Sequence, residues 1–193
     1  MMSLPQRIQL WARSLVISDP EVAENAALGN VRRLRWLLPL FTALVLLLLL
    51  VFTLKPTGDS AAHLAWRNAV SNVYGVTIVY LILMGLAVWR ISARTRLDTG
   101  VRVLQFVAPA GFLVFTAVLA ILDQWVTPNI SPYMLGCVSV SLLFLLPPAT
   151  AASTLLASYL LFFVGLGFTQ PDPALLLTNR ANGFGAALLA LVL

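Results

Sequence analysis

The chain has 193 residues, of which 60% are hydrophobic and only 10% are charged. A mean hydropathy of +0.94 leaves too little polar surface for a water-soluble fold of this length. The net charge of +5 comes from arginines that flank apolar runs, a pattern typical of contact with lipid headgroups rather than with nucleic acid. We therefore expect the lipid bilayer, and no nucleic acid, as the main partner.

Residues 1–33 have the pattern of a cytoplasmic amphipathic and juxtamembrane segment. Its first apolar residues recur at helical spacing, at Leu4, Ile8, Trp11 and Leu15. Ser18 and Glu21 have capping-box spacing around Pro20 and predict the start of a second helix, which Gly29 is expected to end. The segment predicts two short helices before the first membrane span.

Residues 34–193 contain six apolar stretches and predict a six-helix membrane domain. The stretches cover about 34–54, 69–89, 103–122, 132–146, 150–168 and 179–193. The fourth is short for a bilayer of roughly 30 Å, and Pro147-Pro148 predicts a tight turn before the fifth. The sixth is still apolar at Leu193 after about four turns, which predicts a helix cut before it crosses. The predicted fold class is an all-α polytopic transmembrane bundle.

The distribution of basic residues predicts the orientation of this bundle. Nine of the twelve Lys and Arg residues fall in the N-terminal segment or between the second and third spans, and three fall on the opposite side. Because basic loops face the cytoplasm, both chain ends are expected there. The predicted location is the bacterial inner membrane.

Residues suited to catalysis or to cofactor binding are sparse. The chain has one histidine, His63, expected in a loop, and one cysteine, Cys137, inside an apolar run. Neither can build a metal or bis-histidine haem site within one chain, and no nucleophile with a base is evident. We expect no cofactor and no enzymatic activity from this chain.

Polar residues gather at the predicted non-cytoplasmic ends of the spans. The candidate ligand-binding residues are Asp123, Tyr133, Asn179, Arg180 and Asn182. Such groups predict a shallow pocket for a small molecule, in which Asp123 and Arg180 shield each other's charge. The alternative is that they are helix caps and interface anchors. Small residues four apart, Gly183 with Ala187 and Ala186 with Ala190, predict a helix-packing or dimer face.

Three stretches carry a resemblance to a known family. They are residues 132–136 (PYMLG), residues 142–148 (LLFLLPP), and residues 170–173 (QPDP) leading into 179–183 (NRANG). Together they resemble the second half of a MASE-type membrane sensor, the six-helix region that precedes the GGDEF domain of bacterial diguanylate cyclases. The chain has no GGDEF signature, so it cannot make cyclic di-GMP itself.

The resemblance implies a module that detects an unknown small-molecule or lipid signal and controls a cytoplasmic cyclase, as a homodimer. Two alternatives from other classes stay open at this point. A small transporter or channel subunit would need charged or discontinuous helix interiors along a path. A membrane enzyme acting on lipid would need His or carboxylate clusters near the interface, and the sequence lacks them.

Overall fold

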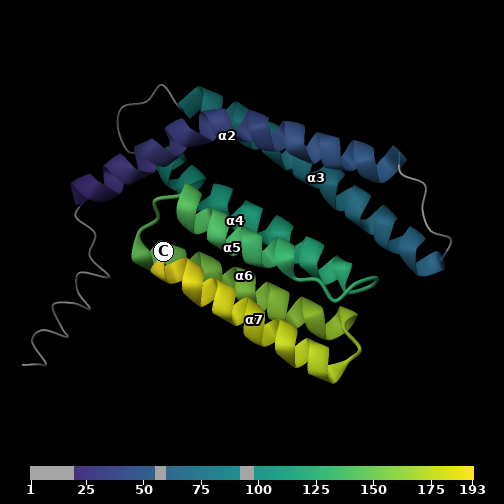
Figure 1. Ribbon diagram of the computed structural model, residues 1–193. Coiled ribbons are helices and arrows are strands. Elements are labelled where there is room, and N and C mark those ends of the chain that lie inside the picture. The colour runs from purple at the N-terminus through teal and green to yellow at the C-terminus, as the bar shows by residue number, and fades with distance from the viewer. Residues whose placement is uncertain (1–19, 55–59, 92–97) are drawn as a thin grey trace, which may run out of the picture.

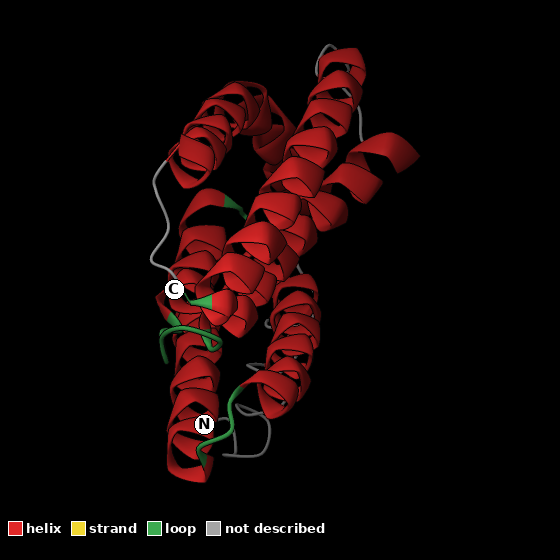
Figure 2. Cartoon of the chain, turned by 90° about the vertical axis from the view of Figure 1, so that its right-hand side faces the viewer, coloured by secondary structure: helices red, strands yellow, loops and turns green. Residues whose placement is uncertain are grey.

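The computed structural model describes residues 20–54, 60–91 and 98–193, and all regular structure in these residues is α-helical (Figure 2). The helices are α2 (Pro20–Leu54), α3 (Ala61–Ile91), α4 (Thr99–Asp123), α5 (Ser131–Leu143), α6 (Pro148–Thr169) and α7 (Pro173–Val192). Five of them, all except α5, are long and apolar enough to cross a membrane. The chain is a multi-pass membrane protein, and the prediction of an all-α helical bundle is confirmed.

The short helix α5 has 13 residues and covers about 20 Å, less than the bilayer core. An extended segment, residues 144–147, follows it and leads to the start of α6 at Pro148. At roughly 3.3 Å per residue this segment spans about 13 Å, and it joins α5 to α6, which is not a direct neighbour of α5. The fourth apolar stretch therefore combines a helix too short to cross alone with a non-helical end.

The helices form two units, and successive helices along the chain run in opposite directions (Figure 1). In the first unit, α4, α5, α7 and α6 pack in a closed ring of four. In the second, α2 and α3 form an antiparallel hairpin that packs on α4. We call the end with the α4–α5 and α6–α7 turns the Asp123 end, and the opposite end, where α5 leads into α6, the Arg33 end.

The first described helix, α2, corrects the predicted N-terminal organisation. Its described part continues from Pro20 through Gly29 and past residues 33 and 34 without a break, and Ser18 of the predicted capping box lies outside the described residues. Glycine inside a helix costs about 1 kcal/mol relative to alanine. Burial of Ala27, Val31 and Leu34 on one face offsets this cost. The predicted stop at Gly29 is wrong, and the predicted surface helix of residues 4–15 lies outside the described residues.

Two other helices begin earlier than predicted, upstream of the polar residues at which the sequence places their starts. The side chain of Asp172 accepts hydrogen bonds from the backbone N–H groups of Ala174 and Leu175 (2.8 and 3.2 Å), and starts α7 at Pro173. With 20 residues α7 is long enough to cross, so the prediction of a short sixth span is wrong. Likewise α3 begins at Ala61, which places His63 in its first turn and not in a loop.

The interior of the four-helix unit is packed around two stacked rings. Tyr133 and Phe162 are both fully buried, with ring centroids 4.2 Å apart and planes 8° from parallel. Gly183 of α7 lies against the Phe162 ring, where a Cβ atom would collide with it. The small-residue face of α7 is buried in this interior, at Gly183, Ala186, Ala187 and Ala190. The helix-packing prediction is confirmed, and the dimer-face alternative is wrong because the chain itself covers this face.

Candidate functional site

The five predicted site residues all lie toward the Asp123 end of the bundle, but they do not line one pocket. Tyr133 is buried in the four-helix interior, and its hydroxyl is 3.4 Å from that of Ser158. Asn182 is exposed on α7. Asn179 is buried, and Asp123 and Arg180 are half-buried. Their role in ligand binding stays a prediction, and their contacts are those of helix junctions.

Asp123 joins α4 to the hairpin. Its carboxylate accepts a hydrogen bond from the indole N–H of Trp66 on α3 (3.1 Å). Beside it, Phe52 packs on Trp66 and Tyr74, and Tyr74 packs on Phe115 of α4, with centroids 5.3 to 6.0 Å apart. This aromatic cluster connects α2, α3 and α4 at the Asp123 end.

Arg180 joins α7 to α6. Its Nε and Nη2 atoms donate to the backbone carbonyl of Phe163 (3.1 and 2.9 Å), and its guanidinium lies 3.8 Å from the centre of the Phe163 ring. Gly167 leaves room for the guanidinium, because a Cβ atom there would come within 2.9 Å of Nη2. Asp123 and Arg180 therefore have separate partners and form no ion pair with each other.

A cluster of three buried amides, Gln124, Gln170 and Asn179, fastens three helix ends together. The side-chain oxygen of Gln124 accepts from Gln170 Nε2 (2.9 Å) and Asn179 Nδ2 (3.0 Å). The Gln124 nitrogen donates to the carbonyls of Ala120 and Asn129 (3.0 and 3.1 Å). Both donors and both acceptor positions of Gln124 are thus used inside the chain. Sequence reasoning left Gln124 and Gln170 out of the site, although they are amides beside apolar spans.

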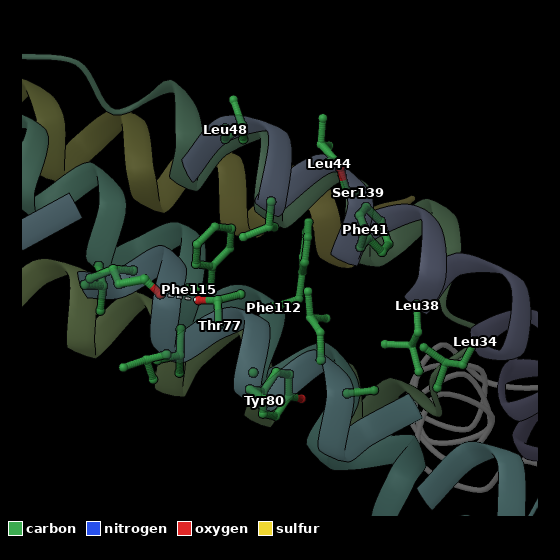
Figure 3. A pocket seen from close by; sticks show the side chains of 18 of the residues that line it. Leu34, Leu38, Phe41, Leu44, Leu48, Thr77, Tyr80, Phe112, Phe115 and Ser139 are labelled. Atoms are coloured by element: carbon green, nitrogen blue, oxygen red, sulfur yellow. Dashed lines mark hydrogen bonds between the residues drawn. The ribbon is translucent and has the colours of Figure 1, made fainter. Parts of the chain in front are cut away.

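A second place with functional potential is a cavity of about 650 Å³ between α2, α3, α4 and α5 (Figure 3). Its wall includes Leu34, Leu38, Phe41, Leu44, Leu48, Thr77, Tyr80, Phe112, Phe115 and Ser139. The volume is within the range of about 300 to 1,000 Å³ that is usual for small-molecule sites. None of the five predicted site residues lines it.

The cavity is elongated along the helices and almost purely apolar. On α2 its lining extends from Leu34 to Leu48, which corresponds to about 21 Å of helix. Two of its few polar side chains are already bound to backbone: Tyr80 donates to the carbonyl of Val107 (2.8 Å) and Thr77 to that of Val73 (2.7 Å). The space therefore offers contacts to hydrocarbon far more than to polar ligands.

At the Arg33 end of the cavity, Asn30 ties α2 to the extended segment after α5. Asn30 is 1% exposed; its Nδ2 donates to the carbonyl of Leu145, and its Oδ1 accepts from the Leu145 N–H, both at 2.9 Å. Non-helical backbone in a bilayer needs such partners within the protein. Arg33 adds a longer contact from Nη1 to the carbonyl of Leu143 (3.4 Å). Sequence reasoning missed Asn30 because it placed this residue before the membrane domain.

Metal-binding potential is low in the part of the chain that the structure describes, where no three His, Cys, Asp or Glu side chains form a group that could hold an ion. Cys137 is buried in the four-helix unit and has no disulfide partner. Comparisons of the chain with protein families, with curated proteins and with solved structures gave no match.

Proposed function

We propose that this chain is a sensory or regulatory module of the bacterial inner membrane that controls a cytoplasmic output domain. The supporting observation is the apolar cavity between the α2–α3 hairpin and the unit that contains the last helix, α7. A ligand in this cavity contacts both units, so its affinity depends on how the units are arranged. Such differential affinity is what allows a ligand to shift a conformational equilibrium.

The contacts around the cavity offer a route from ligand to α7. Leu143 and Phe144, at the end of α5, line the cavity directly beside Leu145, which Asn30 holds. Further along, α5 packs on α7, and the Ser141 hydroxyl donates to the carbonyl of Ala190. A shift at the end of α5 would therefore move the C-terminal part of α7. Allosteric couplings of this kind are typically about 1 to 3 kcal/mol.

The resemblance to MASE-type sensors supports a GGDEF diguanylate cyclase as the output, in a homodimer, with both chain ends in the cytoplasm. In this proposal the membrane chain has no catalytic role, and cyclic di-GMP is made by the attached domain. The arginines near the Arg33 end, at residues 32, 33, 35, 90 and 102, support the cytoplasmic placement of that end.

A transporter or channel subunit is less well supported. Transporters of this kind use free backbone groups of broken helices to hold ions or substrates. The extended segment after α5 is such a break, but Asn30 occupies both the N–H and the carbonyl of Leu145. The charged Asp123 and Arg180 lie near helix ends and are bound to an indole and to a carbonyl.

The test joins the whole chain after Leu193 to a diguanylate cyclase domain that lacks its own sensor. Four fusions, with zero to three inserted residues, sample the rotation of α7 relative to the output. In at least one fusion, Asn30→Ala should change cyclic di-GMP several-fold at matched membrane levels, whereas Ser153→Ala, on exposed α6 surface, should not. Equal cyclic di-GMP from both variants in all four fusions would overturn the proposal.

A further inference from the structure

We infer that the cavity binds one acyl chain of an anionic phospholipid, taken from the leaflet at the Arg33 end, with the lipid phosphate at the arginines of α2. The inference deepens the proposed function, because it names the ligand class of the same cavity. Three features carry it: a side opening, an elongated apolar shape, and two exposed arginines at one end.

The cavity opens sideways toward the surrounding lipid. Three apolar side chains of its wall are also largely exposed: Val76 of α3 (71%), Leu44 of α2 (48%) and Val114 of α4 (44%). In a membrane-spanning bundle such a surface faces the hydrocarbon of the bilayer. The molecules already present at this opening are lipid acyl chains, so entry requires no passage through water.

The shape selects a linear alkyl chain over a compact ligand. The wall follows α2 for about 21 Å, from Leu34 to Leu48, and α4 for about 15 Å, from Ala108 to Val118. Aromatic and aliphatic side chains line this length, and no charged residue is among them. Compact polar molecules would lose hydration here and find few hydrogen-bond partners, since Thr77 and Tyr80 already donate to backbone carbonyls.

Charge at the two ends fixes the direction of the lipid. Leu34, at the Arg33 end of the wall, lies between Arg33 and Arg35 in the sequence, and both arginines are exposed. Guanidinium groups bind phosphate oxygens in a two-pronged geometry. At the other end, Asp123 follows the lining residue Val118 by about 8 Å of helix and would repel an anionic headgroup, while the guanidinium of Arg67 there donates to the carbonyl of Thr53. The phosphate therefore belongs at the Arg33 end, with the tail pointing toward the Asp123 end.

The experiment uses the whole chain in phosphatidylcholine nanodiscs that contain a trace of phospholipid with a diazirine on its acyl chain. Two probes are compared, phosphatidylglycerol and phosphatidylcholine, and labelled peptides are mapped by mass spectrometry. Phosphatidylglycerol should label the cavity walls of α2 and α4 at least fivefold more than the exposed face of α6. Equal labelling of the two surfaces would mean ordinary boundary lipid and would overturn the inference.

Variants test each feature separately. Val76→Trp, at the opening, should lower wall labelling at least threefold, and Val164→Trp, on the exposed face of α6, should leave it unchanged. Arg33→Gln with Arg35→Gln should reduce labelling by phosphatidylglycerol to the level of phosphatidylcholine. If the double glutamine variant labels like the original chain, the arginines do not hold the lipid phosphate and the inference is refuted. Stronger wall labelling by a diazirine fatty acid than by phosphatidylglycerol would also refute it, because the ligand would then need no phosphate.

This outcome is separable from that of the proposed function. Labelling needs no output domain, so its absence would remove the lipid site and leave the sensor proposal standing. Conversely, intact labelling with unresponsive cyclic di-GMP in every fusion would leave a lipid-binding membrane protein without a sensory role.

Discussion

The two hydrogen bonds between Asn30 and Leu145 provide the sharpest test of the structure. Asn30→Ala removes both of them and leaves a peptide N–H and a carbonyl of the extended segment without partners. A protein hydrogen bond contributes a net of about 0.5 to 1.5 kcal/mol, and interhelical bonds in membranes average about 0.6 kcal/mol. Two bonds thus predict a loss of about 1 to 3 kcal/mol in the free energy of unfolding.

The assay is reversible unfolding in mixed micelles by titration with a denaturing detergent, together with hydrogen exchange at the Leu145 amide. A loss of 2 kcal/mol corresponds to exchange roughly 30-fold faster, since about 1.4 kcal/mol is a factor of ten. Asn30→Asp should be at least as destabilising, because its carboxylate retains the acceptor for the Leu145 N–H but faces the Leu145 carbonyl without a donor.

The matched control is Ser153→Ala, which removes an exposed hydroxyl bonded only within α6, to the carbonyl of Thr150. This change should stay within about 0.5 kcal/mol. If Asn30→Ala also stays within that limit and the Leu145 amide exchanges at the original rate, the extended segment finds its partners elsewhere. The tie between α2 and the extended segment after α5 would then be refuted.

Three further predictions follow from other parts of the bundle. Gly183→Ala should destabilise by about 1 to 3 kcal/mol, because its Cβ collides with a buried ring, whereas Gly185→Ala, with open space around it, should be neutral or slightly stabilising in the same titration. The stability losses of Asp123→Ala and Arg180→Ala should add within about 0.5 kcal/mol in the double variant, and a larger coupling would show that the two residues interact after all. A reporter active only in the cytoplasm should be active when fused after Leu193, and inactivity there would reverse the proposed orientation.

Local sequence pattern was sufficient for the positions of the membrane helices but not for their ends. Apolar runs predict where a helix crosses, because the bilayer demands about 20 apolar residues. They do not show how far a helix extends before the run, as α3 does before residue 69 and α7 before Asn179. Gly29 was predicted to end a helix, but the helix continues through it, because burial of its neighbours outweighs the cost of glycine inside a helix.

The polar contacts could not be predicted, because their partners are far apart in sequence. Asn30 and Leu145 are separated by 115 positions, and Gln124 and Asn179 by 55. No local periodicity indicates which backbone carbonyl or amide such a side chain will meet. The opposite charges of Asp123 and Arg180 wrongly predicted that the two residues pair. Asp123 instead accepts from the indole N–H of Trp66, and Arg180 donates to the carbonyl of Phe163 and lies over its ring.

The placement of these polar contacts explains how an apolar cavity can persist inside a membrane protein. Between helices in lipid there is little hydrophobic driving force, so close packing and hydrogen bonds must hold units together. The amide cluster of Gln124 fastens the four-helix unit at the Asp123 end, and Asn30 fastens α2 to that unit at the Arg33 end. Because these hydrogen bonds hold both units, the stretch of α2 from Leu34 to Leu48 does not have to pack tightly against α4 to keep the units together. In the proposed complex, one acyl chain fills the cavity at little cost in protein contacts.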